Sequence, residues 1–180
     1  MLDLIVFGCG SQALYVVENR RAAGLPTPLA MVDLETGGLV GRDVAGVPIR
    51  WNLADSLARL DLARHEVIIA HGDNRRKLDL ADVLLRHGAR FASALHPAAL
   101  ISPLATLGDG CILNAGAVVM PQARLGQHVV LHSMAVVEHD CVVEDGANLA
   151  PGATLAGRVT VGRGAYVYTC LLYTSDAADE

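Results

Sequence analysis

The sequence has few aromatic residues and few charges. Aromatic residues make up 4% and charged residues 18% of the chain, and the charged share is below the roughly 25% usual for soluble domains. Without bulky rings, the core must be built from Val, Leu, Ile and Ala, which favours a narrow, regular structure. The net charge is −5 and no run of Lys and Arg interrupts the sequence, so we expect no nucleic-acid partner.

Long apolar runs and paired cysteines are missing as well. No run approaches the ~20 apolar residues of a membrane span, and no basic segment precedes the first short strand, so we expect neither a span nor a signal peptide. The four cysteines (Cys9, Cys111, Cys141 and Cys170) form no Cys-x-x-Cys pair. This spacing is typical of a reducing cytoplasm and not of a disulfide framework. We therefore expect a cytoplasmic protein.

What the sequence does have is a repeat of six residues. From Ile101 onward an aliphatic anchor recurs at every sixth position, twelve times without a gap, and a small or β-branched residue follows each of the first eleven by four positions. Neither a helix nor a straight amphipathic strand has this period. It predicts a solenoid of short strands, in which three hexads close a triangular coil and each anchor stacks on its equivalent 18 residues further on. The anchors are Ile101, Leu107, Leu113, Val119, Leu125, Leu131, Val137, Val143, Leu149, Leu155, Val161 and Val167.

The residues before the repeat have a different pattern, in which short apolar strands alternate with helices. The expected strands are 4–7, 29–32, which stops at Asp33, and 66–70. The expected helices run from Ser11, as N-cap, to about Ala23, near 53–60 and over about 75–86. Such alternation predicts βαβ units and a parallel sheet. We therefore expect a small Rossmann-like α/β domain over residues 1–97 and a β-helix over 98–169.

The last residues, 170–180, fit neither pattern. The next anchor would fall at Tyr173, after which the sequence becomes Ser-Asp-Ala-Ala-Asp-Glu. Back-translated, this segment looks like read-through into a transposase-type sequencing adapter. We treat it as an artefact that truncates the β-helix at its C-terminus, and we leave it out of the fold argument.

The order of these motifs resembles a known enzyme family. The chain opens on GCGSQA (8–13) and continues through GDN (72–74) and HP (96–97) into hexapeptide repeats, where VEHDC (137–141) is the most specific stretch. This arrangement is similar to the sugar O-/N-acetyltransferases of the NeuD/PglD type, over residues 1–169. The resemblance implies a left-handed β-helix, a homotrimer, acetyl-CoA as co-substrate and transfer of the acetyl group to a sugar amine or hydroxyl.

His139 is the expected general base. It comes two positions after its anchor Val137, so its side chain should point outward, where Asp140 can orient the ring or stabilise the imidazolium. An amine or hydroxyl must lose a proton as it attacks a thioester. The resemblance assigns the base to His139, and the oxyanion-stabilising backbone N–H to Gly157, one coil further on. Without the resemblance, His139 would be interpreted as a surface histidine and Gly157 as a turn glycine.

Two further polar residues are expected near the same face. Asn148 and His132 would there be within reach of acetyl-CoA or the acceptor sugar. The three histidines of the repeat (His128, His132 and His139) also raise a zinc alternative, because β-helix carbonic anhydrases hold zinc with three imidazoles. We expect no metal site.

The first glycine-rich turn has a second interpretation. Gly8-x-Gly10-x-x-Ala13, with Asp33 about twenty residues later, satisfies the dinucleotide fingerprint, which alone would suggest NAD. The α/β part is too short for both halves of a dinucleotide fold. In the resembled family this loop holds the phosphates of a nucleotide-linked sugar and Asp33 faces the nucleoside. The residues expected to hold that ligand are Gly8, Gly10, Ser11, Gln12, Asp33, Gly72 and Asn74.

The chain departs from the family at one point of this turn, where the family often has Gly-Gly-His and this chain has Gly10-Ser11-Gln12. The nucleotide is therefore left open. The expected function is acetyl transfer from acetyl-CoA to a nucleotide-linked sugar or a sialic-acid-like acceptor, for surface polysaccharide or glycoconjugate synthesis. The alternatives are a non-catalytic nucleotide-sugar-binding accessory protein, a hexapeptide acyltransferase with another acceptor such as serine or maltose, and a purely structural β-helix.

Overall fold

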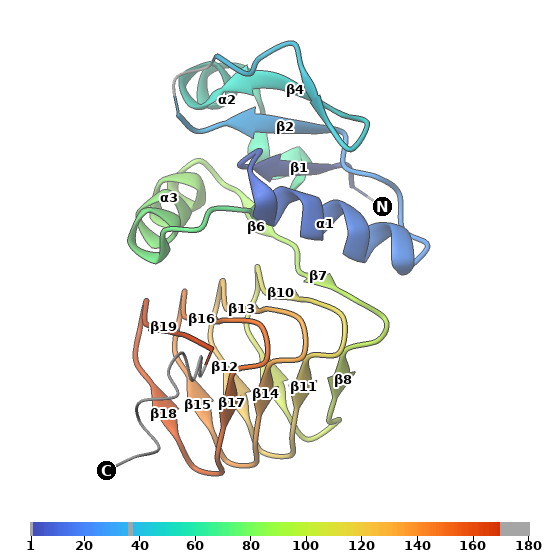
Figure 1. Cartoon of the computed structure of the whole chain (residues 1–180). Helices are drawn as coiled ribbons and strands as arrows, with labels where there is room; N and C mark the ends of the chain where they lie inside the picture. Colours follow the sequence, from blue (N-terminus) through green and yellow to red (C-terminus); the bar gives the residue numbers. More distant parts are fainter. Residues whose placement is uncertain (1, 36–37, 170–180) are drawn as a thin grey trace, which may run out of the picture.

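The computed structural model of the chain describes residues 2–35 and 38–169, so the proposed adapter segment 170–180 lies outside the described residues. It has two parts, an α/β layer and a prism of short strands below it (Figure 1). Within the described ranges, no helix has the length and apolar character needed to cross a membrane.

The α/β part is built on a six-stranded sheet in the order β3-β4-β2-β1-β5-β6. All neighbouring strands pair in parallel except β3 and β4, which form an antiparallel hairpin that the sequence pattern did not predict. The elements are β1 (Leu4–Phe7), α1 (Ser11–Ala22), β2 (Ala30–Asp33), β3 (Asp43–Val44), β4 (Val47–Asn52), α2 (Leu53–Arg59), a short 3-10 helix (Leu62–Arg64), β5 (Glu66–Ile69), α3 (Asn74–Arg86) and β6 (Arg90–Phe91).

The central strand β1 is buried on both sides, which explains its uninterrupted apolar sequence. Leu4 and Val6 face α1 and the prism, whereas Ile5 and Phe7 face the layer that contains α3. One expectation at the end of this strand is corrected. The N-cap of α1 is Gly10 and not Ser11, because Ser11 already has helical geometry and Gly10 is extended.

The second part is a left-handed parallel β-helix with the triangular coil that the sequence predicted. Each strand pairs with the strand 18 residues further on, as Val119 does with Val137. The first sheet contains β7 (Ala94–Leu95), β10 (Ile112–Leu113), β13 (Val130–Leu131), β16 (Asn148–Leu149) and β19 (Tyr166–Val167). The second contains β8 (Leu100–Ile101), β11 (Val118–Val119), β14 (Val136–Val137) and β17 (Thr154–Leu155). The third contains β9 (Thr106–Leu107), β12 (Arg124–Leu125), β15 (Val142–Val143) and β18 (Thr160–Val161).

The interior of the prism is filled by the anchors and by the small residues four positions after them. Val137, Val143 and Leu149 are fully buried, as are Cys111 and Cys141 at small-residue positions. Only the second residue of each two-residue strand points inward, so the first is free to make contacts outside the prism. On the first sheet these outward residues pack against the α/β part.

Apolar packing and hydrogen bonds of polar side chains join the two parts. Ile112 and Val130, on the outer face of the first sheet, share one core with the α/β residues of that face. The amide of Asn19 donates to the carbonyl oxygens of Ala94 at 3.0 Å and of Leu113 at 3.1 Å.

A buried lysine lies in the same interface. Lys77 on α3 has no exposed surface, and its Nζ donates to Asn148 Oδ1 on β16 at 2.7 Å. Burial lowers the pKa of Lys77 to about 7, because the apolar surroundings disfavour the ammonium form.

This lysine should make the stability of the protein depend on pH. The unfolded state holds the Lys77 proton up to about pH 10.5 and the folded state only to about pH 7. Between these values the unfolded state binds more protons, so the contribution to stability grows as pH rises and is lost as pH falls through 7. We expect the free energy of unfolding to rise by up to about 1.4 kcal/mol per pH unit relative to Lys77→Met, which has no titrating group. Urea unfolding of both proteins across this range measures the difference, and parallel pH profiles would contradict the assignment.

Candidate functional site

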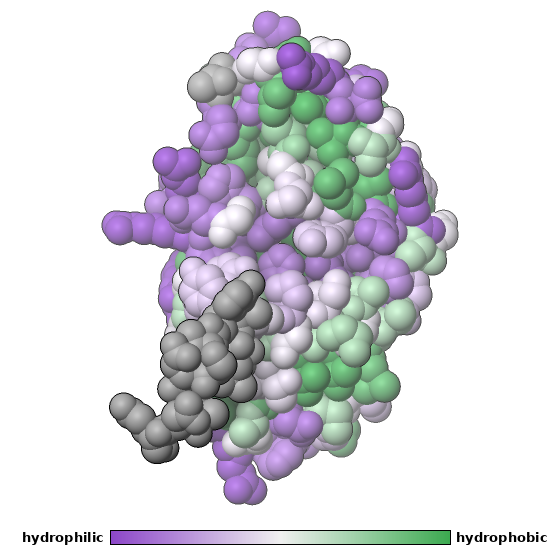
Figure 2. All heavy atoms as spheres, viewed as in Figure 1, coloured by the Kyte–Doolittle hydropathy of each residue, from purple (hydrophilic) through white to green (hydrophobic). Residues whose placement is uncertain are grey.

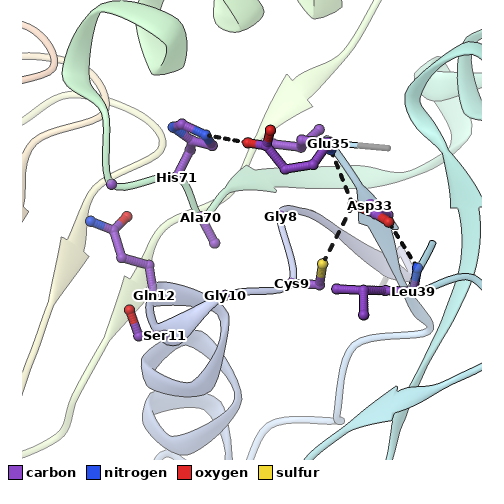
Figure 3. A pocket seen from close by; sticks show the side chains of 12 residues that line it. Gly8, Cys9, Gly10, Ser11, Gln12, Asp33, Glu35, Leu39, Ala70 and His71 are labelled. Atoms are coloured by element: carbon purple, nitrogen blue, oxygen red, sulfur yellow. Dashed lines mark hydrogen bonds and ion pairs between the residues drawn. The ribbon is translucent and has the colours of Figure 1, made fainter. Parts of the chain in front are cut away.

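A pocket of about 320 Å³ opens at the carboxyl ends of β1, β2 and β5. Figure 3 shows how the turn after β1, the loop after β2 and the segment after β5 converge on it. Ligands of open parallel sheets bind at such a crevice, where the strand order reverses. We call this hollow the α1 pocket, and it is lined by Gly8, Cys9, Gly10, Ser11, Gln12, Asp33, Leu34, Glu35, Leu39, Ala70, His71 and Gly72.

Six of the seven residues expected to hold a nucleotide-linked sugar line the α1 pocket. The exception is Asn74, whose amide instead donates to the carbonyl oxygens of Gly164 and Ala165, both at 3.0 Å. It lies in the first turn of α3, facing the prism, and the expectation for its location is corrected accordingly.

The turn after β1 needs glycine for a steric reason. Gly8 has φ +122°, and a Cβ at this position would overlap the carbonyl oxygen of Ala70. The next glycine, Gly10, caps α1, whose first turn carries no acidic side chain. The positive end of this helix therefore faces the α1 pocket and favours an anionic group there.

Asp33 shapes the loop that borders the pocket. Its side chain is almost completely buried, and its two carboxylate oxygens accept from the backbone N–H groups of Glu35 at 3.0 Å and Leu39 at 3.1 Å. Cys9 lies beside it, with Sγ 3.9 Å from Asp33 Oδ1. Burial, reinforced by the Asp33 carboxylate, raises the pKa of the Cys9 thiol, so this cysteine is poorly activated as a nucleophile.

Sequence reasoning missed two polar side chains of this pocket, His71 and Glu35. His71 Nδ1 accepts from the backbone N–H of Asp73 at 3.1 Å, so its Nε2 is the donor, and it lies 3.6 Å from Glu35 Oε1. Arg76 Nη1 donates to the same oxygen at 3.4 Å. The signal for His71 was its place two residues after the end of β5, where a side chain reaches the crevice.

A second polar group lies on the prism. His139 is at the corner that joins the second and third sheets, where its side chain is 52% exposed. Its Nδ1 is 2.8 Å from Asp140 Oδ2. Because the carboxylate can only accept, Nδ1 carries the proton, and Nε2 is left to accept another. Arg158 Nε is 4.0 Å from the same carboxylate oxygen.

Gly157 packs directly against this imidazole. A Cβ at residue 157 would lie 2.6 Å from His139 Nε2, so any side chain there would displace the ring. The backbones are in register as well, since the N–H of Arg158 donates to the carbonyl oxygen of His139 at 2.9 Å. The sequence spacing of one coil thus predicted the proximity of His139 and Gly157. Beside them a hollow of about 330 Å³ runs along the same edge, lined by Leu104, Thr106, Gln122, Arg124 and Asp140.

Asn148 and His132 lie elsewhere than expected. Asn148 is fully buried on the first sheet, bonded to Lys77, and His132 packs edge-on against Tyr15 with ring centroids 5.7 Å apart. Both belong to the side of the prism that faces the α/β part, whereas His139 lies on the opposite edge. Their placement near the face of His139 is therefore corrected.

The three histidines considered as zinc ligands do not lie together at one site. His128 is buried edge-on against Phe91, with ring centroids 4.5 Å apart, and burial lowers its pKa to about 4. His132 is engaged with Tyr15 and His139 with Asp140. Each imidazole thus has a separate environment at a different corner or coil.

The fold, a left-handed prism of six-residue repeats, is that of the hexapeptide-repeat acyltransferases. No family model matches the sequence, but solved structures do. A GDP-perosamine N-acetyltransferase from Caulobacter crescentus, solved as a histidine-to-alanine mutant with CoA and GDP-perosamine, is 32% identical with a TM-score of 0.85. The match covers 93% of this chain and 77% of that one.

Two other solved structures are similar. The acetyltransferase domain of PglB from Neisseria gonorrhoeae, in complex with acetyl coenzyme A, is 28% identical with a TM-score of 0.76, and the match covers 91% of this chain and 80% of that one. WeeI from Acinetobacter baumannii, at 18% identity and a TM-score of 0.69 over 94% of this chain and 90% of that one, shares the fold. The chain therefore belongs to the hexapeptide-repeat sugar acetyltransferases, which use acetyl-CoA.

The contact between Gly157 and His139 can be tested by adding one methyl group. Gly157→Ala should displace the imidazole by a fraction of an ångström to about one ångström. For the general base that the sequence predicts at His139, such a displacement should cost roughly 10- to 100-fold in rate. The melting temperature should change little, because an exposed side chain can move. Gly162→Ala is the control, since a Cβ there meets only Glu144 Oε2 at 4.0 Å. CoA release and thermal melting of both variants are the measurements, and a full rate for Gly157→Ala would contradict the prediction.

Proposed function

We propose that this acetyltransferase acetylates the amine of a nucleotide-linked amino sugar, with His139 as general base. The single observation that carries this proposal is the His139–Asp140 pair at 2.8 Å, packed against Gly157 on an exposed edge of the β-helix. The pair leaves one imidazole nitrogen free to take a proton. That is what an amine requires when it attacks a thioester.

The proposed reaction uses these groups as follows. The amine nitrogen attacks the thioester carbon of acetyl-CoA, and His139 Nε2 removes the proton that the nitrogen must lose. Asp140 holds Nδ1 and stabilises the imidazolium. The backbone N–H of Gly157 is the proposed donor to the oxyanion of the tetrahedral intermediate. When the intermediate collapses, the carbon–sulfur bond breaks, and the imidazolium returns its proton to the departing CoA thiolate.

The α1 pocket is the proposed site of the acceptor. Its glycine turn and helix N-terminus suit a diphosphate, because backbone N–H groups and the helix dipole favour negative charge. The Caulobacter enzyme was solved with GDP-perosamine, a nucleotide-linked amino sugar, which supports the same acceptor class here. A free sialic-acid-like acceptor has no diphosphate that the N-terminus of α1 could bind. The acetylated product would then serve the synthesis of a surface polysaccharide or glycoconjugate.

A homotrimer is part of the proposal. Within one chain, the α1 pocket and His139 lie on opposite sides of the first sheet, so an acceptor in the pocket would meet His139 of another copy. The second sheet offers a surface for association. Leu100 is 59% exposed there, and Leu104 and Met134 at its two corners are 60% and 65% exposed. Figure 2 shows apolar surface on the lower right of the molecule, where β8 and β11 lie in Figure 1.

Removing the imidazole tests the proposed base. His139→Ala should lower the rate of acetyl transfer by about 10²- to 10⁴-fold, the usual contribution of a general base. The fold should be retained because the side chain is exposed. The measurement is CoA release from acetyl-CoA across a panel of nucleotide-linked amino sugars and free sialic acid.

The matched control is His87→Ala, which removes an exposed histidine from the α/β part. It should keep the wild-type rate. An unchanged rate for His139→Ala would refute the proposed base. Tight binding of a nucleotide sugar without CoA release by the wild-type protein would favour a binding protein over an enzyme.

The proposed trimer can be tested by placing a charge on the second sheet. Leu100→Glu should lower the sedimenting mass from three chains to one, since a buried unpaired carboxylate opposes association. Leu85→Glu, at a leucine of α3 that is 61% exposed, is the control and should sediment like the wild type. Analytical ultracentrifugation gives the mass, and a wild-type protein that sediments as a monomer would contradict the trimer.

A further inference from the structure

A second hollow adjoins the α1 pocket, separated from it by the side chains of Glu35 and His71. We call it the leucine hollow. It measures about 370 Å³ and is lined by Leu34, Glu35, Leu53, His71, Arg76 and Leu80. Leu34 follows β2, Leu53 begins α2, and Arg76 and Leu80 belong to α3. Because Leu34, Glu35 and His71 line both hollows, one ligand can extend from one into the other.

We propose that the leucine hollow receives the nucleobase of the acceptor, and that Glu35 selects guanine as that base. This inference rests on the proposed function, which puts a nucleoside diphosphate in the α1 pocket. Beyond the proposed function, it specifies the base that the chain accepts and the residue that selects this base.

The position of the hollow fits a base. With the diphosphate at the N-terminus of α1, the nucleoside passes the loop held by Asp33 and reaches the gap between the segments that follow β2 and β5. That gap is the leucine hollow. Three leucine side chains can pack against the faces of a planar ring, and the burial of apolar surface favours this arrangement.

The polar groups at the rim of the hollow fit guanine. Glu35 offers two acceptor oxygens, and Arg76, 3.4 Å from one of them, offers donors. Guanine presents two adjacent donors, the N1–H and N2 amino groups, beside the acceptor O6. A carboxylate matches those two donors and a guanidinium matches the acceptor. Uracil and hypoxanthine each present only one ring N–H on this edge, and adenine presents a ring acceptor that a carboxylate repels.

The side chain of Glu35 is held where this contact requires it. His71 Nε2 lies 3.6 Å from Glu35 Oε1 (Figure 3). The imidazole is itself oriented by the backbone N–H of Asp73. Arg76 holds the same oxygen from α3. A carboxylate near a diphosphate would weaken binding by repulsion unless the ligand supplies donors to it. Glu35 thus disfavours bases that lack the pair of donors as well as favouring guanine.

The experiment uses the full chain without acetyl-CoA and three probes, GDP, IDP and UDP, in isothermal titration calorimetry. IDP differs from GDP only in lacking the N2 amino group. Wild type should bind GDP about tenfold more tightly than IDP or UDP, the value of one hydrogen bond to a charged group. Glu35→Gln should bring the ratio of GDP to IDP affinity close to one. Glu18→Gln, which removes the same charge from an exposed position on α1, should keep the wild-type ratio.

An unchanged GDP-to-IDP ratio in Glu35→Gln would overturn the inference, as would equal affinities of the wild type for GDP and UDP. Both results leave the proposed function intact, because a nucleoside diphosphate is still bound. If the wild type binds none of the three probes, the acceptor class of the proposed function fails together with this inference.

Discussion

Stacking of each aliphatic anchor on its equivalent one coil away is the interaction on which the rest of the structure depends. Val119, Val137 and Leu155 follow one another in this way inside the prism. Their register also fixes what lies outside, because residues two positions after the last two anchors, His139 and Gly157, must then lie over one another. The proposed site is therefore a consequence of core packing, and a shift of one residue between Val137 and Leu155 would separate His139 from Gly157.

The same register decides how the α/β part sits on the prism. The first sheet turns Ile112, Val130 and Asn148 outward, and these residues are buried against the α/β part. Asn148 accepts a hydrogen bond from Lys77, and Asn19 donates to the carbonyl oxygens of Ala94 and Leu113. These contacts hold the α1 pocket at a fixed distance from the edge that bears the proposed base, on the other side of the same chain.

Much of this could be predicted from sequence, wherever a fixed period or a strand end places a residue. The prism, the proximity of His139 and Gly157, and the glycine turn at β1 are of this kind. Which of the three sheets docks on the α/β part was not predictable, because the six-residue repeat is the same in all three. Asn148 and His132 were misplaced for that reason. Glu35 and Asn74 belong to segments whose course depends on tertiary contacts, so spacing gave no signal of their contacts, whereas the end of the expected strand 66–70 was an unused signal for His71.

The central claim is that this chain moves an acetyl group from acetyl-CoA to the amine of a nucleotide-linked amino sugar. Mass spectrometry of the acceptor after incubation with isotope-labelled acetyl-CoA tests it most directly. The account predicts one labelled acetyl group on the sugar nitrogen, formed in step with the release of CoA. Recovery of every offered nucleotide sugar without label, from protein that is folded and binds acetyl-CoA, would contradict it.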